Sequence, residues 1–210
     1  MIKNMFESKI YHNYDYIIEE ICDYFGEEYA EEIKNRAKKV GIVVVKEAGT
    51  VQVEDVSINV DSEPVCIKND SGAQLIIPAD ISCDPSGNVV IVHLLLHALG
   101  EELFVKNGKE IFNETIVDYM ANEISKGLKR RNVDVTAVET PNYESKSFYS
   151  NMFNDVEEFF EENKEKIIDR RMGKLVEFEN VEDLIEIVQN KAENLLDRNK
   201  SNKDIVIKRR

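Results

Sequence analysis

The sequence predicts an α+β protein with an N-terminal helix, a small and mostly antiparallel sheet, a central helix that carries two histidines, and a C-terminal helical lobe. Apolar residues recur at helical spacing near the N-terminus, alternate in short β-branched runs from residue 41, and return to helical spacing after residue 87. The turns between the β-branched runs are too short for crossover helices, which favours antiparallel pairing. We expect a single domain over residues 1–210, with an α/β lobe at 1–87, a helical lobe at 88–198 and a tail at 199–210.

The composition is typical of a globular protein, and its charge argues against binding to nucleic acid. The 210 residues are 42% hydrophobic and 32% charged, and the formal net charge is −14. A chain of this length can bury a substantial core. Nucleic-acid binding needs a basic surface that displaces counterions from phosphates, and here 41 acidic residues outnumber 27 basic ones.

Membrane insertion and export are not expected either. The longest apolar run, residues 89–99, is shorter than the roughly 18 residues of a membrane span and contains two histidines. The first twenty residues carry acids and aromatics where a signal peptide needs an apolar segment. Cys22, Cys66 and Cys83 lack Cys-x-x-Cys spacing, so neither a disulfide framework nor a cysteine zinc site is indicated. We therefore expect a cytoplasmic protein with free thiols and no membrane partner.

The N-terminal region is expected to be helical from Tyr16 to Val40, with a break at Gly26. Its apolar positions follow a helical period and are Ile17, Ile18, Ile21, Tyr24, Phe25, Tyr29, Ile33 and Ala37. Strand patterns follow, at residues 42–45, 51–53, 56–60, 65–67 and 74–77. These short runs predict one sheet of four or five strands.

Two histidines lie four positions apart within residues 89–100. Residues 84–88 contain an aspartate, a proline and a serine, which favour a helix start, so a helix is expected from about Asn88 to Phe104. In a helix, His93 and His97 stack one turn apart on one face, with Cβ atoms roughly 5–6 Å apart. Both imidazoles can then reach one metal ion. The alternative is a pair of core histidines that are hydrogen-bonded to backbone or carboxylate groups.

A second acid-bearing helix follows the histidines. Glu114 and Asp118 share one of its faces, at the border of an apolar stripe, and Asn113 is a candidate N-cap. The stripe consists of Ile116, Val117, Met120, Ala121 and Ile124. At this border the two acids could line a cleft. Alternatively, Glu114 is an acid that the helix dipole favours in the first turn, and Asp118 is a surface charge that faces water.

These features resemble the zincin metallopeptidases of the glutamate-ligand type, including small zincin-like proteins of bacteria and their phages. The resemblance covers residues 73–125 and implies a zincin-like fold. It implies that His93, His97 and Glu114 bind zinc, and that Asp118 orients one of the imidazoles. The segment before the histidine helix, Gln74, Leu75, Ile76 and Ile77, corresponds to a strand that pairs with extended substrate in such enzymes. The alternative, which the sequence alone favours slightly, is a core strand.

The zincin motif is degenerate in this chain. The sequence is His93-Leu94-Leu95-Leu96-His97, and Leu94 replaces the glutamate that serves the family as general base. Glu101 lies one turn beyond His97 and is a weak substitute. Tyr143 and Tyr149 are candidates to stabilise an oxyanion, although ordinary packed aromatics are the better interpretation of both.

We therefore expect a zinc-binding, peptidase-like protein that lacks efficient catalysis and binds a peptide or protein. The first alternative is a metal-free α+β interaction or regulatory protein with structural histidines. The second is an active zinc peptidase with an unusual base.

Two more helices are predicted, at residues 148–168 and 176–196, and the polar tail after them is expected to be poorly ordered.

Overall fold

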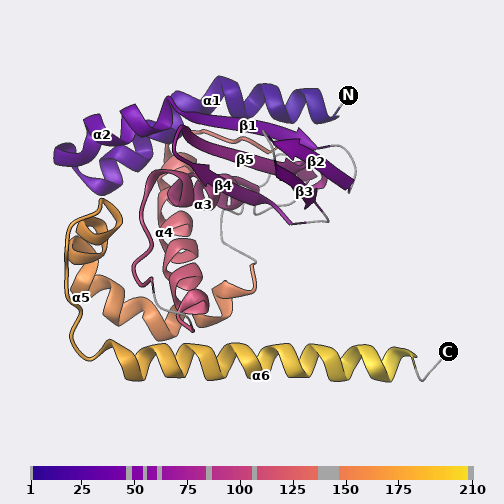
Figure 1. The fold of residues 1–210 in the computed structure, drawn as a ribbon, viewed down its shortest axis with the longest axis vertical. Helices are drawn as coiled ribbons and strands as arrows, with labels where there is room; N and C mark the ends of the chain where they lie inside the picture. The colour runs from indigo at the N-terminus through magenta and orange to yellow at the C-terminus, as the bar shows by residue number, and fades with distance from the viewer. Residues whose placement is uncertain are drawn as a thin grey trace. The chain divides into compact units, whose positions relative to one another are not determined.

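The computed structural model describes residues 2–45, 49–53, 56–60, 63–83, 87–105, 108–136 and 147–207. The chain divides into two compact units: unit 1 contains residues 1–100 and 120–146, and unit 2 contains residues 101–119 and 147–210. Helix α4, Glu110–Arg130, is continuous and contributes residues to both units (Figure 1). This division differs from the predicted lobes, because the histidine helix groups with the sheet and the later helices group with the start of α4.

Unit 1 begins with two helices, α1 at Ile2–Phe25 and α2 at Glu27–Ala37. The predicted break at Gly26 is confirmed: its φ of 100° is a conformation that glycine adopts without steric cost. The helix starts far earlier than the predicted Tyr16. Phe6 and Ile10 are fully buried and extend the apolar period of the later turns toward the N-terminus.

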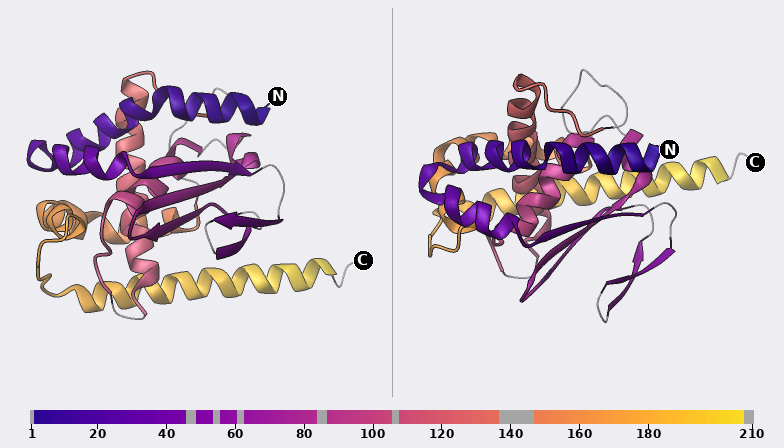
Figure 2. Two further views of the ribbon diagram at one scale, coloured as in Figure 1. Left: turned by 45° about the horizontal axis from the view of Figure 1, so that its top comes forward. Right: turned by 90° about the horizontal axis from the view of Figure 1, so that it is seen from above.

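The strands lie close to the predicted runs, but they form two sheets instead of one. Strands β1 (Val40–Val45), β5 (Gly72–Pro78) and β4 (Val65–Asn69) form a mixed sheet in the order β1-β5-β4. β1 pairs with β5 in parallel, and β4 pairs with β5 antiparallel. Strands β2 (Gly49–Val53) and β3 (Val56–Val60) form a separate antiparallel hairpin, which extends beyond this sheet in both views of Figure 2. The α+β class is thus confirmed, with more helix than strand.

The suggestion that residues 74–77 pair with substrate is corrected by the sheet order. Gln74, Leu75, Ile76 and Ile77 belong to β5. All four are paired with β1 on one side, and Gln74, Leu75 and Ile76 are also paired with β4 on the other. Both hydrogen-bonding edges of β5 are therefore used within the sheet, and Leu75, Ile76 and Ile77 are fully buried. The core-strand alternative is the one that the structure supports.

The histidine helix α3, Gly87–Leu99, follows a short 3-10 helix at Ala79–Cys83 and packs against β4 and β5. It ends at Leu99, five residues before the predicted Phe104, and two cations bind the carbonyls at this end. Arg36 Nη1 donates to Leu99 O at 2.6 Å, and Lys68 Nζ donates to Gly100 O at 2.8 Å. Cations at a helix C-terminus compensate the macrodipole and its unpaired carbonyls. The predicted capping residues 84–86 lie outside the described residues.

Unit 2 contains the first turns of α4, a 3-10 helix η2 at Tyr149–Met152, and helices α5 (Phe153–Arg171) and α6 (Val181–Ile207). Its core is rich in aromatic rings, and the ring contacts join Phe104, Phe112, Tyr119, Phe153, Phe159, Phe160 and Phe178. Helix α6 runs through most of the predicted tail, so residues 199–207 continue a helix instead of following one. None of the helices in the described ranges combines the length and hydropathy that a membrane span requires.

Candidate metal centre

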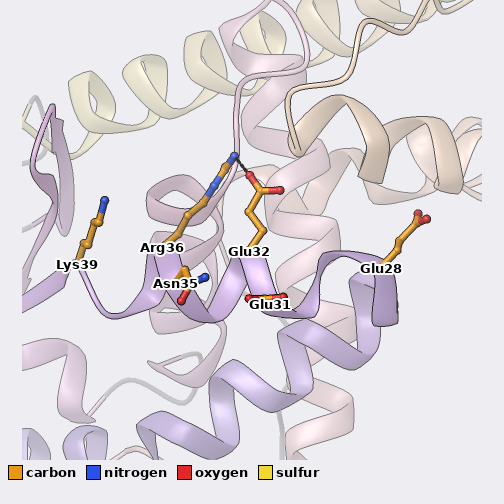
Figure 3. A pocket seen from close by; sticks show the side chains of 6 residues that line it. All are labelled: Glu28, Glu31, Glu32, Asn35, Arg36 and Lys39. Atoms are coloured by element: carbon orange, nitrogen blue, oxygen red, sulfur yellow. Dashed lines mark hydrogen bonds and ion pairs between the residues drawn. The ribbon is translucent and has the colours of Figure 1, made fainter.

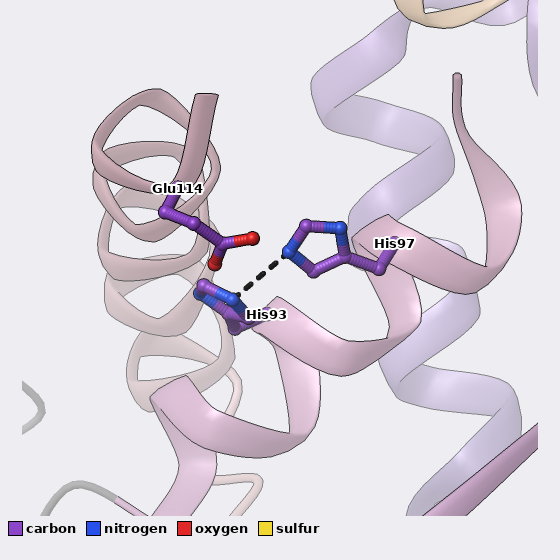
Figure 4. A group of neighbouring side chains, drawn as sticks. All are labelled: His93, His97 and Glu114. Atoms are coloured by element: carbon purple, nitrogen blue, oxygen red, sulfur yellow. Dashed lines mark hydrogen bonds between the residues drawn. The ribbon is translucent and has the colours of Figure 1, made fainter. Parts of the chain in front are cut away.

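Three side chains from two helices form a group that could hold a metal ion. His93 and His97 come from α3, and Glu114 comes from α4. Their potential ligand atoms all lie within 4.8 Å of one another (Figure 4). The predicted convergence of the three residues is therefore present, although this geometry does not identify the metal.

The separation of the two imidazoles suits a shared ion. The Nε2 atoms of His93 and His97 are 3.1 Å apart, and the ring planes are inclined by 52°. A tetrahedral zinc ion with Zn–N bonds of about 2.0–2.1 Å holds two nitrogen ligands about 3.3 Å apart. A carboxylate oxygen of Glu114 lies within 4.8 Å of a ring nitrogen of each histidine. The donor set of two imidazoles and one carboxylate is also one that zinc accepts.

The histidines lie on the face of α3 that reaches solvent. Val90, His93 and His97 follow helical spacing and are only partly buried, whereas the other ten residues of the helix are buried. Glu114 is partly buried as well. Most of α3 is thus buried, but this stripe gives the imidazoles access from solvent.

Leu94, which stands where the resemblance to zincins implies a general base, is 4% exposed. An aliphatic side chain cannot accept a proton, so the residue beside His93 supplies packing and no acid–base chemistry. Glu101, the weak substitute, is exposed and follows the end of α3, where its backbone N–H donates to Arg171 O at 2.7 Å.

Asp118 is 3% exposed, which excludes its interpretation as a surface charge. Its Oδ2 accepts a hydrogen bond of 2.5 Å from the hydroxyl of Ser147. The role toward an imidazole that the resemblance implies for Asp118 stays a prediction. The sequence analysis missed Ser147, because nothing in a local pattern connects a loop serine with an acid 29 positions earlier.

Asn113 does not cap α4, which begins three residues earlier at Glu110. Its buried side chain instead bonds both backbone groups of Phe104: Oδ1 accepts from Phe104 N at 3.2 Å, and Nδ2 donates to Phe104 O at 2.8 Å. This pair of bonds attaches the loop after α3 to the turn of α4 that carries Glu114.

Arg171 is the largest fully buried side chain among the described residues. Burial lowers the pKa of its guanidinium to about 10, against the opposing effect of Glu102, Glu114 and Glu101 in decreasing order. The group is therefore still a cation at neutral pH. No feature of the local sequence distinguished this arginine from the solvated basic residues near it.

Of the two oxyanion candidates, Tyr143 lies outside the described residues. Tyr149 is partly buried in η2, and its ring packs edge-on against Phe148 with centroids 5.6 Å apart. This contact agrees with the packed-aromatic interpretation of Tyr149.

A surface hollow on α2 is lined by charged side chains that include Glu32 and Arg36, which form an ion pair of 2.5 Å (Figure 3). Arg36 is also the residue that binds the last carbonyl of α3. One residue of this hollow therefore also supports the end of the histidine helix.

Comparison of the chain with protein-family models, curated proteins and solved structures found no match.

Proposed function

We propose that His93, His97 and Glu114 bind a zinc ion in a zincin-like protein that recognises a peptide or protein without cleaving it efficiently. The observation that supports this proposal best is the pairing of the two Nε2 atoms at 3.1 Å, with a carboxylate of the next helix within reach. Two imidazoles on a solvent-accessible face, in a chain of only three histidines, suit a metal site better than a packing role.

The same residues argue against efficient peptidase activity. Bound zinc would act as a Lewis acid toward a carbonyl or carboxylate oxygen of a ligand. Hydrolysis also requires a group that takes a proton from the attacking water, and such general acid–base help contributes typically 10²–10⁴-fold. Leu94 is apolar and buried, and cannot supply this help. Polarisation of a bound peptide without its cleavage is the activity that remains.

Metal analysis of tag-free protein tests the proposal directly. Wild type and His12→Ala should each contain close to one zinc ion per chain, because His12 is an exposed residue of α1. His93→Ala and Glu114→Gln should lose most of it, whereas Glu123→Gln on the same helix should keep it. Wild type that takes up no zinc from a buffered zinc solution, while folded, would refute the proposal.

One observation also fits a metal-free interaction protein, which is the second candidate. A distance of 3.1 Å between two ring nitrogens is also that of a direct hydrogen bond. Under this alternative, His93→Ala destabilises the protein equally in the presence of zinc and of a chelator. Under the zinc proposal, zinc stabilises wild type and does not stabilise the variant.

A further inference from the structure

We infer that Asn113 is a positioning residue for Glu114, because its side chain attaches the first turn of α4 to the loop that follows the histidine helix. The inference rests on the proposed zinc site and deepens it, since it names the contact that sets where the carboxylate meets an ion held by the two histidines. Asn113 acts through its chain neighbour and is not itself a ligand.

The carboxamide of Asn113 makes two hydrogen bonds to one residue, Phe104, which lies nine positions earlier in the chain. Oδ1 accepts from Phe104 N at 3.2 Å, and Nδ2 donates to Phe104 O at 2.8 Å. A carboxamide presents a donor and an acceptor in one plane, so the two bonds fix its orientation as well as its distance from the loop. The side chain is 5% exposed, so little water can replace these bonds when they are lost.

Phe104 is a fixed support for this attachment. Its ring centroid lies 5.8 Å from that of Phe112 and 5.5 Å from that of Phe178, in the aromatic core of unit 2. The residue before it is bonded to α5, because Arg170 Nε donates to Leu103 O at 3.1 Å. The core of unit 2 therefore holds the loop, and the carboxamide transmits the position of the loop to α4.

Glu114 lies close to the start of α4, where a helix is least constrained by its own bonds. The helix begins at Glu110, and the first four N–H groups of any helix lack partners within it, so terminal turns fray. Glu114 directly follows Asn113, and consecutive Cα atoms are about 3.8 Å apart, so a movement of this turn moves the carboxylate with it. The bonds to Phe104 therefore restrict the positions from which Glu114 can approach the imidazoles.

The same attachment connects the two helices that carry the candidate ligands. The loop that contains Phe104 starts where α3 ends, at Leu99, two residues after His97. The Asn113 bonds join this loop to the residue before Glu114 and bypass the rest of the segment between the helices. A ligand that is held in place before the ion arrives loses less freedom on binding, so the attachment should contribute to metal affinity.

Zinc affinity, measured by competition with a chromophoric chelator at neutral pH, tests the inference. Asn113→Leu has a similar shape and removes both bonds. It should weaken zinc binding about 10-fold, the lower end of the effect of removing a group that orients a metal ligand.

Thr115→Val is the matched control, because Thr115 follows Glu114 on its other side. Its side chain is fully buried, and its hydroxyl donates to Ile111 O at 2.7 Å within α4. The variant loses a buried hydrogen bond without detaching the first turn from the loop. It should lose stability and keep the zinc affinity of wild type.

A spectroscopic readout separates positioning from folding. With Co²⁺ in place of zinc, the visible absorption of Asn113→Leu should differ in shape from that of wild type, because the carboxylate meets the ion at another angle. Thr115→Val should reproduce the wild-type spectrum. If Asn113→Leu does not fold, Asn113→Gln decides the question: it keeps the donor and the acceptor on a longer side chain, and its zinc affinity and Co²⁺ spectrum should both differ from those of wild type.

The outcomes distinguish this inference from the function on which it depends. Zinc affinity and Co²⁺ spectra that are unchanged in a folded Asn113 variant, with zinc bound by wild type, would overturn the positioning role alone. Equal losses of zinc affinity in Asn113→Leu and Thr115→Val would also overturn it, because they would reflect destabilisation of α4 in general. A wild-type protein that binds no zinc would overturn both proposals.

Discussion

The Nε2 atoms of His93 and His97 face each other at 3.1 Å, one turn apart on α3. This distance is close to the roughly 3.3 Å that separates two nitrogen ligands of a tetrahedral zinc ion. The same helix places Leu94 in the core beside His93. The chain therefore combines a group that could hold a metal ion with an apolar residue where the resemblance to zincins implies a catalytic base, and the two features can be tested separately.

Leu94→Glu should introduce zinc-dependent hydrolysis of casein, if the missing base is the main obstacle to catalysis. The hydrolysis rate of Leu94→Glu should exceed that of Leu94→Gln by about 10²- to 10⁴-fold, because glutamine has the shape of glutamate but cannot act as a base. Both variants should lose stability, since position 94 is 4% exposed. Equal inactivity of the two folded, zinc-loaded variants would mean that the surrounding cleft is also unsuited to hydrolysis.

Ser147→Ala should destabilise the protein by about 1–3 kcal/mol, because it leaves a buried carboxylate oxygen of Asp118 without its 2.5 Å hydrogen bond. The free energy of unfolding by urea measures the effect. Ser150→Ala is the control: this hydroxyl bonds only the Ser147 carbonyl, at 2.7 Å, among the described contacts, and its loss should cost no more than about 1 kcal/mol. Equal losses in the two variants would show that the bond to Asp118 has no special weight.

Tyr14→Phe should change how stability depends on alkaline pH. Burial, and secondarily the charge of Asp15, raises the pKa of Tyr14 from 10.0 to about 12, and its hydroxyl donates to Ala37 O at 3.0 Å. Since the folded-state pKa is the higher one, the stabilisation is complete below pH 10 and is lost as the pH rises through about 12. Wild type should exceed the variant by about 1 kcal/mol at pH 8, and the difference should shrink above pH 10.

The matched control for this pH dependence is Tyr16→Phe, which removes the hydroxyl of a tyrosine that is 51% exposed. It should keep the wild-type decline above pH 10. A Tyr14→Phe profile that runs parallel to wild type from pH 8 to 12 would contradict the assignment of the shift to this residue.

A positive φ alone makes alanine cost about 1 kcal/mol relative to glycine, and Gly72→Ala should destabilise the β4–β5 hairpin by more than this. Gly72 has a φ of 155°, and an added Cβ would lie 2.2 Å from the backbone oxygen of Lys39, which also accepts a bond from Ala73 N. Gly108→Ala is the control, because its φ is 86° and no described atom lies within 4 Å of its Cβ position. The midpoint of thermal denaturation compares the two variants. Equal decreases would mean that the sheet accommodates the added Cβ without further cost.

Local sequence patterns determined the positions of several helices and strands and the common face of the two histidines. The spacing of His93 and His97 determines their common helix face, and Gly26 determines the break between α1 and α2, because both effects act within one or two helical turns. The alternating runs located the strands to within a few residues. The residue type of Leu94 was likewise enough to predict that the position beside His93 cannot act as a general base.

Only the tertiary structure decided which elements are neighbours. β5 became a central strand by pairing with β1 across intervening strands, and the end of α3 at Leu99 is bonded by Arg36, which comes from α2. Ser147 bonds Asp118 of α4, and the carbonyl of Arg171 accepts a bond from Glu101 in the loop before α4. Contacts between distant segments depend on the packing of whole faces, and a local pattern carries no information about which face will meet which.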